Sequence, residues 1–342
     1  MATLKQIAEL AGVSHATVSN VLNGQSKTVR AAAAKRAELI RRIANDLNYR
    51  PDQSARSLRR GRTGMVAVLG TKLWKPDVYN MELFEAMSLV AGKLEDKGFS
   101  LSAEMQATEG KSLYRMPRWK VDAAVVVAAY REDELAAVEE AGVPYVSFNG
   151  EVGAHGSAVQ FDDVHGMNLA VDALADRGHR RIAYVSDVID NGHRSVRIRR
   201  ETYLDAMRRR GLTPLPGYQP QYFDAERFTE DFRVFREAQR PTAVVTYNPA
   251  CAMLVYQAAM ALNFRLPDDL SVITFNDSLI GTAALSPRLS AVARPPAAAA
   301  EAVTELLLER LGDEPVEPRR IQLQPQLVLR DSVAPSHPST TD

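Results

Sequence analysis

Short polar side chains gather on a helical stretch near the start of the chain, AGVSHATVSNVLNG at 11–24. One face is apolar at helical spacing: Val13, Val18, Val21 and Leu22. The rest is small or polar, without the Lys or Glu common on solvated faces: His15, Ala16, Thr17, Ser19 and Asn20. Hydroxyl and amide groups held this close to a backbone can reach the phosphates and base edges of a duplex. The alternative interpretation is an ordinary set of capping and helix residues.

Two helices and a tight turn would position this face. Thr3 is a predicted N-cap for a helix over 4–10, Gly12 supplies the turn, and Ser14 caps a second helix that runs to about Asn23. The apolar face of the first helix is Leu4, Ile7, Ala8 and Leu10. A pair of helices joined in this way is the helix-turn-helix unit.

The same region is strongly basic. Residues 1–62 hold twelve Lys and Arg against four Asp and Glu, a net charge of +8, and the rest of the chain has a net charge of −8. A third helix is predicted within 30–49 and ends at Pro51. Its predicted inward face is Leu39, Ile40, Ile43, Ala44 and Leu47. A small basic head on a larger acidic body indicates that the head meets a polyanion.

The helix-turn-helix pattern predicts which residues touch DNA. We expect base contacts from His15, Ala16 and Asn20, because Asn pairs bidentately with adenine and an Ala methyl can meet a thymine methyl. Phosphate contacts are expected from small polar residues near the helix ends: Thr3, Ser14, Thr17, Ser19 and Asn23. The expected partner of the head is therefore double-stranded DNA.

Composition and motifs argue against several other classes. Hydrophobic residues make up 46% of the 342, as in soluble globular proteins, and no apolar run approaches the ~20 residues of a membrane span. The absence of a signal-peptide pattern and the single Cys251 predict a cytoplasmic location. No catalytic, cofactor-binding or metal-binding motif occurs. The acid pair Asp162–Asp163 is predicted to cap a strand end or contact a ligand.

From Met65 onwards, short apolar strands alternate with helical stretches. The predicted strands lie at 65–70, 99–104, 122–128, 143–148, 181–187, 243–248 and 271–277. Continuous Val, Ile and Ala runs separated by amphipathic helices predict parallel sheets covered on both faces. Two successive sets predict an α/β body of two doubly wound subdomains with a cleft between them, where ligands lie beyond the carboxyl ends of the strands.

Two segments of the head match a known pattern. AELAGVSHATVSNVLNG follows A-G-V-S-x-x-T-V-S-x-V-L-N, and LNYRPDQSARSLRRGRTGMVAVLG follows Y-x-P, a short A-R-x-L hinge helix and a first strand. The head thus resembles the lactose-repressor/galactose-repressor (LacI-type) family of bacterial transcription regulators. The resemblance implies that Ala55 and Leu58 form a hinge whose Leu wedges into the minor groove. Two hinges side by side imply a homodimer on a palindromic operator.

The body is similar to the same family, which has a periplasmic-binding-protein-like body. FDDVHGMNLAVDALADRGHRRIAYVSD, PTAVVTYN, LPDDLSVITFND and LSAVARP match its segments, whereas the region between Asn23 and Tyr49 is about one helical turn longer than usual. The resemblance implies a DNA-binding domain at 1–50, a hinge and linker at 51–62 and a body at 63–331. The polar, Pro-rich composition of 332–342 predicts a disordered tail. Within the body it implies subdomain 1 at about 63–161 and 293–324, and subdomain 2 at about 162–292 and 325–331.

The expected effector pocket departs from the family pattern. The resemblance implies that Arg199 is a retained pocket residue of the family. Asn248 is followed by Pro249 where the family has an Asp, and Asn276 replaces a family Asp. Arg294 replaces a family Gln. Three alternatives stay open: an anion such as a sugar phosphate or organic acid, which Arg forks suit, a neutral ligand such as a sugar, or no small effector. Further predicted contacts are Asn149, which could instead be a turn residue, and Phe223.

The predicted function is a transcription regulator without enzymatic activity, a homodimeric repressor whose operator affinity depends on an effector in the body. The first alternative is a constitutive DNA binder with a degenerate cleft. A sugar-binding transport protein would share the body but would lack the basic head. A sugar-processing α/β enzyme is disfavoured because no catalytic constellation occurs.

Overall fold

The computed structural model describes residues 2–22, 31–49, 62–70, 81–103, 116–117, 120–128, 135–186, 193–216, 225–312 and 314–336. Four predicted site residues lie outside these segments: Asn23, Ala55, Leu58 and Phe223. The chain divides into two compact units, Met1–Thr63 (the head) and Gly64–Asp342 (the body). No helix in the described segments is long and apolar enough to cross a membrane.

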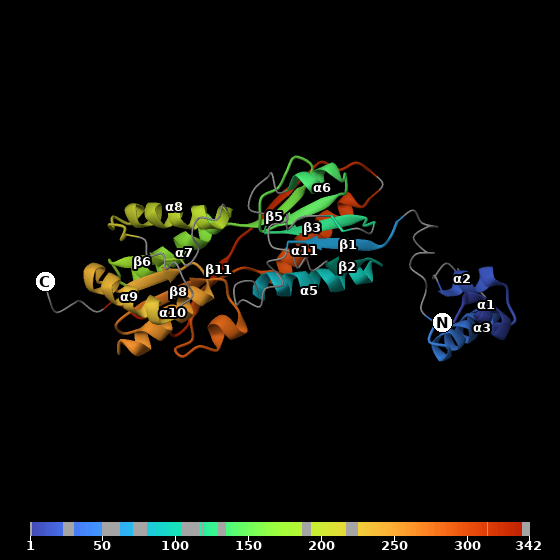
Figure 1. Ribbon diagram of the computed structural model, residues 1–342, viewed down its shortest axis with the longest axis horizontal. Helices are drawn as coiled ribbons and strands as arrows, with labels where there is room; N and C mark the ends of the chain where they lie inside the picture. Colours follow the sequence, from blue (N-terminus) through green and yellow to red (C-terminus); the bar gives the residue numbers. More distant parts are fainter. Residues whose placement is uncertain are drawn as a thin grey trace. The chain divides into compact units, whose positions relative to one another are not determined.

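The head is a three-helix unit, drawn in blue in Figure 1, of α1 (Leu4–Ala11), α2 (His15–Leu22) and α3 (Ala31–Asp46). The Thr3 hydroxyl accepts from the Gln6 backbone N–H and the Gln6 side chain accepts from the Thr3 N–H, which is a capping box. Gly12 ends α1 in the left-handed region at φ 63°, where a side chain would be strained. The three helices enclose one small core: Ile7, Ala8, Val18, Val21, Ala37, Ile40 and Ala44.

Two expected core residues of the head are exposed instead. Leu10 has 63% of its surface exposed because it lies off the buried stripe that positions 4, 7, 8 and 11 make along α1. Leu47 follows the last residue of α3 and is also exposed. Ala37, which the sequence pattern did not single out, fills the core in their place.

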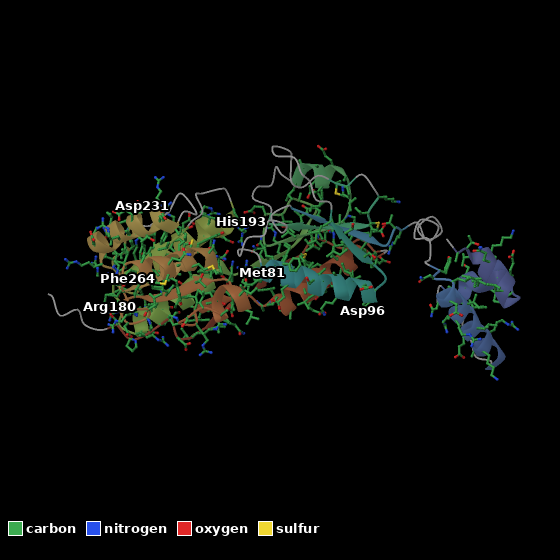
Figure 2. The ribbon with its side chains drawn as sticks, turned by 60° about the horizontal axis from the view of Figure 1, so that its bottom comes forward. Met81, Asp96, Arg180, His193, Asp231 and Phe264 are labelled. Carbon is green, nitrogen blue, oxygen red and sulfur yellow. The ribbon has the colours of Figure 1, made fainter. Side chains whose placement is uncertain are left out.

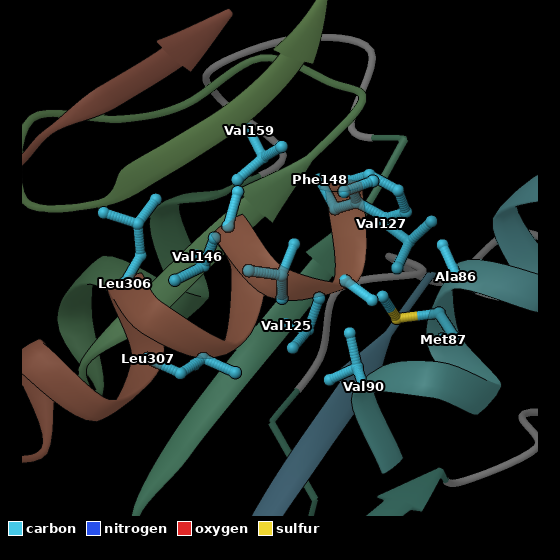
Figure 3. Close-up of a cluster of buried hydrophobic side chains, with 14 of the residues drawn as sticks. Ala86, Met87, Val90, Val125, Val127, Val146, Phe148, Val159, Leu306 and Leu307 are labelled. Carbon is cyan, nitrogen blue, oxygen red and sulfur yellow. The ribbon is translucent and has the colours of Figure 1, made fainter. Parts of the chain in front are cut away.

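The first lobe of the body, lobe 1, is built on a six-stranded parallel sheet. Its strands are β1 (Met65–Leu69), β2 (Ser100–Ala103), β3 (Ala123–Val127), β4 (Tyr145–Phe148), β5 (Ser157–Phe161) and β10 (Arg320–Leu323), in the order β10-β5-β4-β3-β1-β2. Helices α5 (Met81–Asp96) and α11 (Pro296–Arg310) cover one face, and α6 (Ala136–Glu140) lies on the other. Figure 3 shows Val90 of α5 and Leu307 of α11 packed against Val125 of the sheet.

The second lobe, lobe 2, is a five-stranded sheet between two helix layers. Its strands are β6 (Ile182–Val185), β7 (Ala243–Thr246), β8 (Ser271–Phe275), β9 (Ser290–Ala293) and β11 (Gln326–Val328), in the order β11-β9-β8-β7-β6. One layer holds α7 (Asp163–Asp176) and α8 (Arg194–Arg209). The other holds α9 (Ala225–Gln239) and α10 (Pro249–Ala261), and a single π-helical turn, η4 (Leu279–Ala283), packs on α10.

The predicted fold class is confirmed: a helical head and an α/β body of two sheets, with helices on both faces of each. The central strands β3, β7 and β8 are buried along their length, as parallel strands between helix layers must be, whereas the edge strands β2, β10 and β11 are partly exposed. One described pair departs from the prediction, because β11 runs antiparallel to β9. The chain passes between the lobes after β5, after β9 and between β10 and β11, as Figure 1 shows at the centre of the body.

The predicted disordered tail begins too early. Ser332 is fully buried, where its hydroxyl donates to the Val272 carbonyl at 2.6 Å and accepts from the Ser290 N–H at 2.8 Å. Ser336 donates its N–H to the Arg177 carbonyl at 2.8 Å. Residues 332–336 are therefore bonded to the end of lobe 2, because backbone groups of that region would otherwise lie buried without partners.

His179 is hydrogen-bonded to this C-terminal segment, and its environment predicts that the stability of the fold depends on pH. Its Nε2 lies 3.0 Å from the Ala334 carbonyl, which can only accept, so Nε2 donates and Nδ1 accepts from the Thr242 hydroxyl, also at 3.0 Å. Burial lowers the pKa of His179, with a smaller contribution from the charge of Arg177. Because the unfolded chain then binds a proton more readily, we expect stability to fall as the pH drops below about 6.5.

Urea unfolding of the wild type and of His179→Gln between pH 8 and pH 5.5 measures this effect. At pH 8 the variant is expected to be less stable than the wild type by about 1–3 kcal/mol, because the Thr242 hydroxyl and the Ala334 carbonyl lose their hydrogen bonds to the ring. Between pH 8 and pH 5.5 the variant is expected to lose less stability than the wild type. The comparison isolates His179 because the other five His residues are present in both proteins. Equal pH slopes in the two proteins would contradict the prediction.

Candidate nucleic-acid interface and effector site

The exposed face of α2 is where the predicted base contacts lie. His15, Ala16 and Asn20 are all exposed, and Ala16 and Asn20 are neighbours one turn apart. Val18 and Val21 anchor the opposite face in the head core. A helix held this way presents short side chains on a rigid surface, which is the requirement for entering a major groove.

Ser14 and Thr17 lie together at the start of α2. The Ser14 hydroxyl accepts from the Thr17 backbone N–H at 3.2 Å and lies 2.9 Å from the Thr17 hydroxyl. Thr3 is likewise exposed at the start of α1, where it forms its capping box. Each helix N-terminus therefore combines a hydroxyl with backbone N–H groups, a combination that suits a phosphate oxygen.

Ser19 does not share this position. It is 4% exposed and lies among the buried residues of α2, so the structure argues against its predicted phosphate contact. The side chain follows Val18 in sequence, and the core-facing stripe of α2 is wide enough to include it. Exposed cations elsewhere in the head can contact phosphates instead: Lys5, Lys35, Arg36, Arg41 and Arg42.

The predicted effector residues of the body follow the carboxyl ends of strands. Asn149 follows β4, Asn276 follows β8 and Arg294 follows β9, and all three are buried. Asn149 and Asn276 have left-handed backbones, at φ 55° and 69°, so both predictions fall on turns that end a strand. Asn248 follows β7 and caps α10, where its side-chain oxygen accepts from the Cys251 N–H at 2.9 Å.

Arg199 is enclosed by its own lobe. Its side chain is 2% exposed, Nε donates to Asp163 at 2.8 Å, and Nη1 donates to the Tyr247 carbonyl at 2.8 Å. The guanidinium carbon lies 3.9 Å from the centre of the Phe275 ring, in cation–π contact. Burial alone would favour a protonated Asp163, yet the charge and the hydrogen bond of Arg199 hold the pKa of Asp163 below its usual value.

Arg294 is paired in the same way, but with the other lobe. Its Nε donates to the Glu82 carboxylate of α5 at 2.7 Å, and both side chains are nearly inaccessible. The guanidinium carbon lies 4.9 Å from the centre of the Phe161 ring, at the end of β5. Burial raises the pKa of Glu82, and the charge and hydrogen bond of Arg294 oppose that shift.

A second hydrogen bond between the lobes is made at Asn149. The His193 ring, at the start of α8, has its Nε2 2.9 Å from the Asn149 carbonyl oxygen and therefore donates to it. His193 also caps α8, because its Nδ1 accepts from the Ser195 N–H. Figure 2 shows His193 at the inner end of lobe 2, toward lobe 1. Asn149 thus takes part in contacts between the lobes as well as ending a strand.

Sequence reasoning missed the two acids that neutralise the arginines. Asp162, which follows β5, caps α7 by accepting from the His165 N–H at 2.8 Å, so it caps a helix and not the predicted strand end, while Asp163 is the partner of Arg199. Glu82 gave no signal, because an acid in the first turn of an amphipathic helix is an ordinary solvated residue. Among the described residues, no group of three or more His, Cys, Asp or Glu could hold a metal ion.

Comparison with known proteins agrees with this arrangement. The profile described as "Bacterial regulatory proteins, lacI family" matches residues 3–52, and the profile of a periplasmic binding protein-like domain matches residues 171–333. The ribose operon repressor of Escherichia coli (strain K12) is 29% identical, with 97% of this chain and 100% of that protein covered.

Two solved structures extend the likeness over 97% of the chain. One is a complex of the transcriptional regulator CelR with cellobiose, at 25% identity, a TM-score of 0.65 and 100% coverage of that chain. The other is the lac repressor dimer bound to operator and an anti-inducer, at 22% identity, a TM-score of 0.76 and 99% coverage. A basic helix-turn-helix head on a two-lobed body defines a DNA-binding transcription regulator. The head carries the helix-turn-helix domain of the lacI family of bacterial regulatory proteins, and the body carries a periplasmic-binding-protein-like domain.

Proposed function

We propose that this protein is a cytoplasmic homodimeric repressor, without enzymatic activity, that binds a palindromic operator under the control of a small molecule bound by the body. The observation that supports it best is the exposed face of His15, Ala16 and Asn20 on a helix anchored by buried Val18 and Val21. In this proposal Ala55 and Leu58 form the minor-groove hinge. The domain limits follow the same scheme, with the head ending near residue 50 and a hinge over 51–62.

Selection of random duplex DNA on the purified full-length protein tests the proposal. One enriched palindrome at physiological salt is the expected result, with an affinity that falls steeply as salt rises, because cations of the head displace counterions. No enriched sequence would contradict the proposed function.

Asn20→Ala is expected to relax the base preference at one position of each half-site, by about 1–3 kcal/mol, if Asn20 pairs bidentately with a base. The variant and the wild type are compared on operators that differ only at that position. Ser14→Ala is the matched comparison, because loss of a phosphate contact weakens binding to all sequences alike. A uniform loss of affinity in Asn20→Ala would place Asn20 on the backbone instead.

The charges of the body favour a neutral effector over an anionic one, two of the three alternatives that the sequence left open. Arg199 and Arg294 each face a buried carboxylate, so neither brings an uncompensated positive charge to a ligand. The relatives include a ribose operon repressor, and a similar solved structure is a complex with cellobiose, so we propose a sugar-like, uncharged ligand. Repeating the DNA selection with separate pools of neutral sugars, sugar phosphates and organic acids distinguishes the classes. Release by the acidic pools alone would overturn this assignment.

Exposed apolar side chains mark the proposed dimer surface. Lobe 1 exposes Met81, Phe84 and Leu89 on α5, and lobe 2 exposes Met260, Leu279 and Ile280 on α10 and η4. In Figure 1, α5 and the orange segment that contains η4 lie along the lower edge of the body, and both come forward in Figure 2. Apolar patches of this kind mark interfaces. A second copy of the chain is the proposed occupant, since a palindrome needs two heads.

A further inference from the structure

Glu82 is an acid of lobe 1 that is buried against lobe 2. It lies in the first turn of α5, and its side chain is 6% exposed, whereas Met81 and Glu85 beside it are exposed. An acid is favourable in the first turn of a helix, but that position does not require burial. Burying a carboxylate is costly unless charged or polar partners compensate it.

Both oxygens of the carboxylate are used, and both bind groups at the edge of lobe 2. Oε2 accepts from Arg294 Nε at 2.7 Å, where β9 ends and the chain returns to lobe 1. Oε1 accepts from the backbone N–H of Asp277, which follows β8. The positive charge of Arg294 also lowers the pKa of Asp163, so the Asp163–Arg199 ion pair of lobe 2 belongs to the same group of interacting charges.

Bonds within lobe 2 hold the Asp277 backbone N–H in place independently of Glu82. The Asp277 carboxylate accepts two bonds from Arg330, at 2.9 and 2.7 Å, and one from the Thr282 hydroxyl. Asn276, at φ 69°, turns the backbone directly before that amide. The fixed N–H of Asp277 and the guanidinium of Arg294 converge on the same carboxylate and so form a receptor for one anion.

We infer that Glu82 is a built-in ligand: its carboxylate occupies an anion receptor made of Arg294 and the Asp277 amide and so holds the two lobes together in the absence of any effector. The chain thereby supplies the group that an anionic ligand would otherwise bring. If the protein is the effector-controlled repressor proposed above, its effector binds a body whose lobes Glu82 already joins; this consequence rests on the proposed function. The joining itself is independent of DNA.

The test measures hydrogen exchange of the Asp277 amide in full-length protein without DNA. In Glu82→Ala this amide loses its acceptor, and we expect exchange at least tenfold faster than in the wild type. Sodium formate or acetate should restore slow exchange with a saturating dose dependence, because either anion can enter the vacated receptor, whereas sodium chloride at equal ionic strength should not. Glu85→Ala, an exposed acid on the same helix, should behave as the wild type.

Unchanged exchange in Glu82→Ala, or accelerated exchange that neither carboxylate restores, would overturn the inference. If Glu82→Ala does not fold, Glu82→Leu keeps a side chain of similar volume without an acceptor and should exchange faster than the wild type at Asp277; no acceleration there would count equally against it. Operator binding is measured in parallel on the wild type. Its absence would remove the proposed function and would leave the exchange result standing.

Discussion

Asp163→Asn is expected to lower the free energy of unfolding of the body by about 3–5 kcal/mol, because it leaves the Arg199 guanidinium buried without its counter-charge. The pair is inaccessible on both sides, at 2% and 3% exposure, and the Asp163 pKa below its usual value indicates that the ionised form is the stable one. Denaturant unfolding of the wild type and the variant at neutral pH, followed by the same spectroscopic signal, measures the difference.

Two controls separate a buried pair from an ordinary one. Asp172→Asn removes a partner of Arg209 between the same two helices, but both of those side chains are exposed, so a loss below about 1 kcal/mol is expected. The double variant Asp163→Leu with Arg199→Met replaces the whole pair by apolar groups and should recover most of the lost stability. If Asp163→Asn lowers the free energy of unfolding no more than Asp172→Asn does, the charge of Arg199 is compensated by a group other than Asp163.

The fold could be predicted from sequence because each element has a local signal. Apolar runs such as 123–127 and 271–275 are buried strands, and Gly12 marks the turn between the first two helices. Other elements lack such a local signal, among them β5 and α11. β5 has the sequence SAVQF, in which a polar residue interrupts a short apolar run. α11 begins with PAAAA, a turn in which the two faces of the helix do not differ in polarity.

The effector site could be located but not described from sequence. The carboxyl ends of parallel strands meet at one edge, so residues such as Asn276 and Arg294 could be assigned to that edge in advance. Their partners could not, because Glu82 lies 212 residues before Arg294 in the chain, and nothing local distinguishes a buried acid from a solvated one. The expectation of free arginines, and with it the anionic effector, came from this missing information.

Leu279→Glu is expected to convert the dimer into monomers at micromolar concentration and to weaken binding to the palindromic operator by 100-fold or more. Leu279 and Ile280 are 79% and 63% exposed, so a charge there costs the folded monomer little, but it would be desolvated without a partner in an interface. Two linked heads bind a palindrome with an avidity of roughly 10²–10⁴ over one head, and that factor is lost when the dimer separates.

Sedimentation and operator titration of the same preparations decide this point. Phe84→Glu places the same charge on the exposed face of α5 and should act in the same direction, whereas Val234→Glu, on an exposed position of α9, should leave both the dimer and its affinity unchanged. Binding to a duplex with a single half-site should be equal in all four proteins, since the head is untouched. Dimers that persist in both Leu279→Glu and Phe84→Glu would mean that the second copy binds elsewhere on the body.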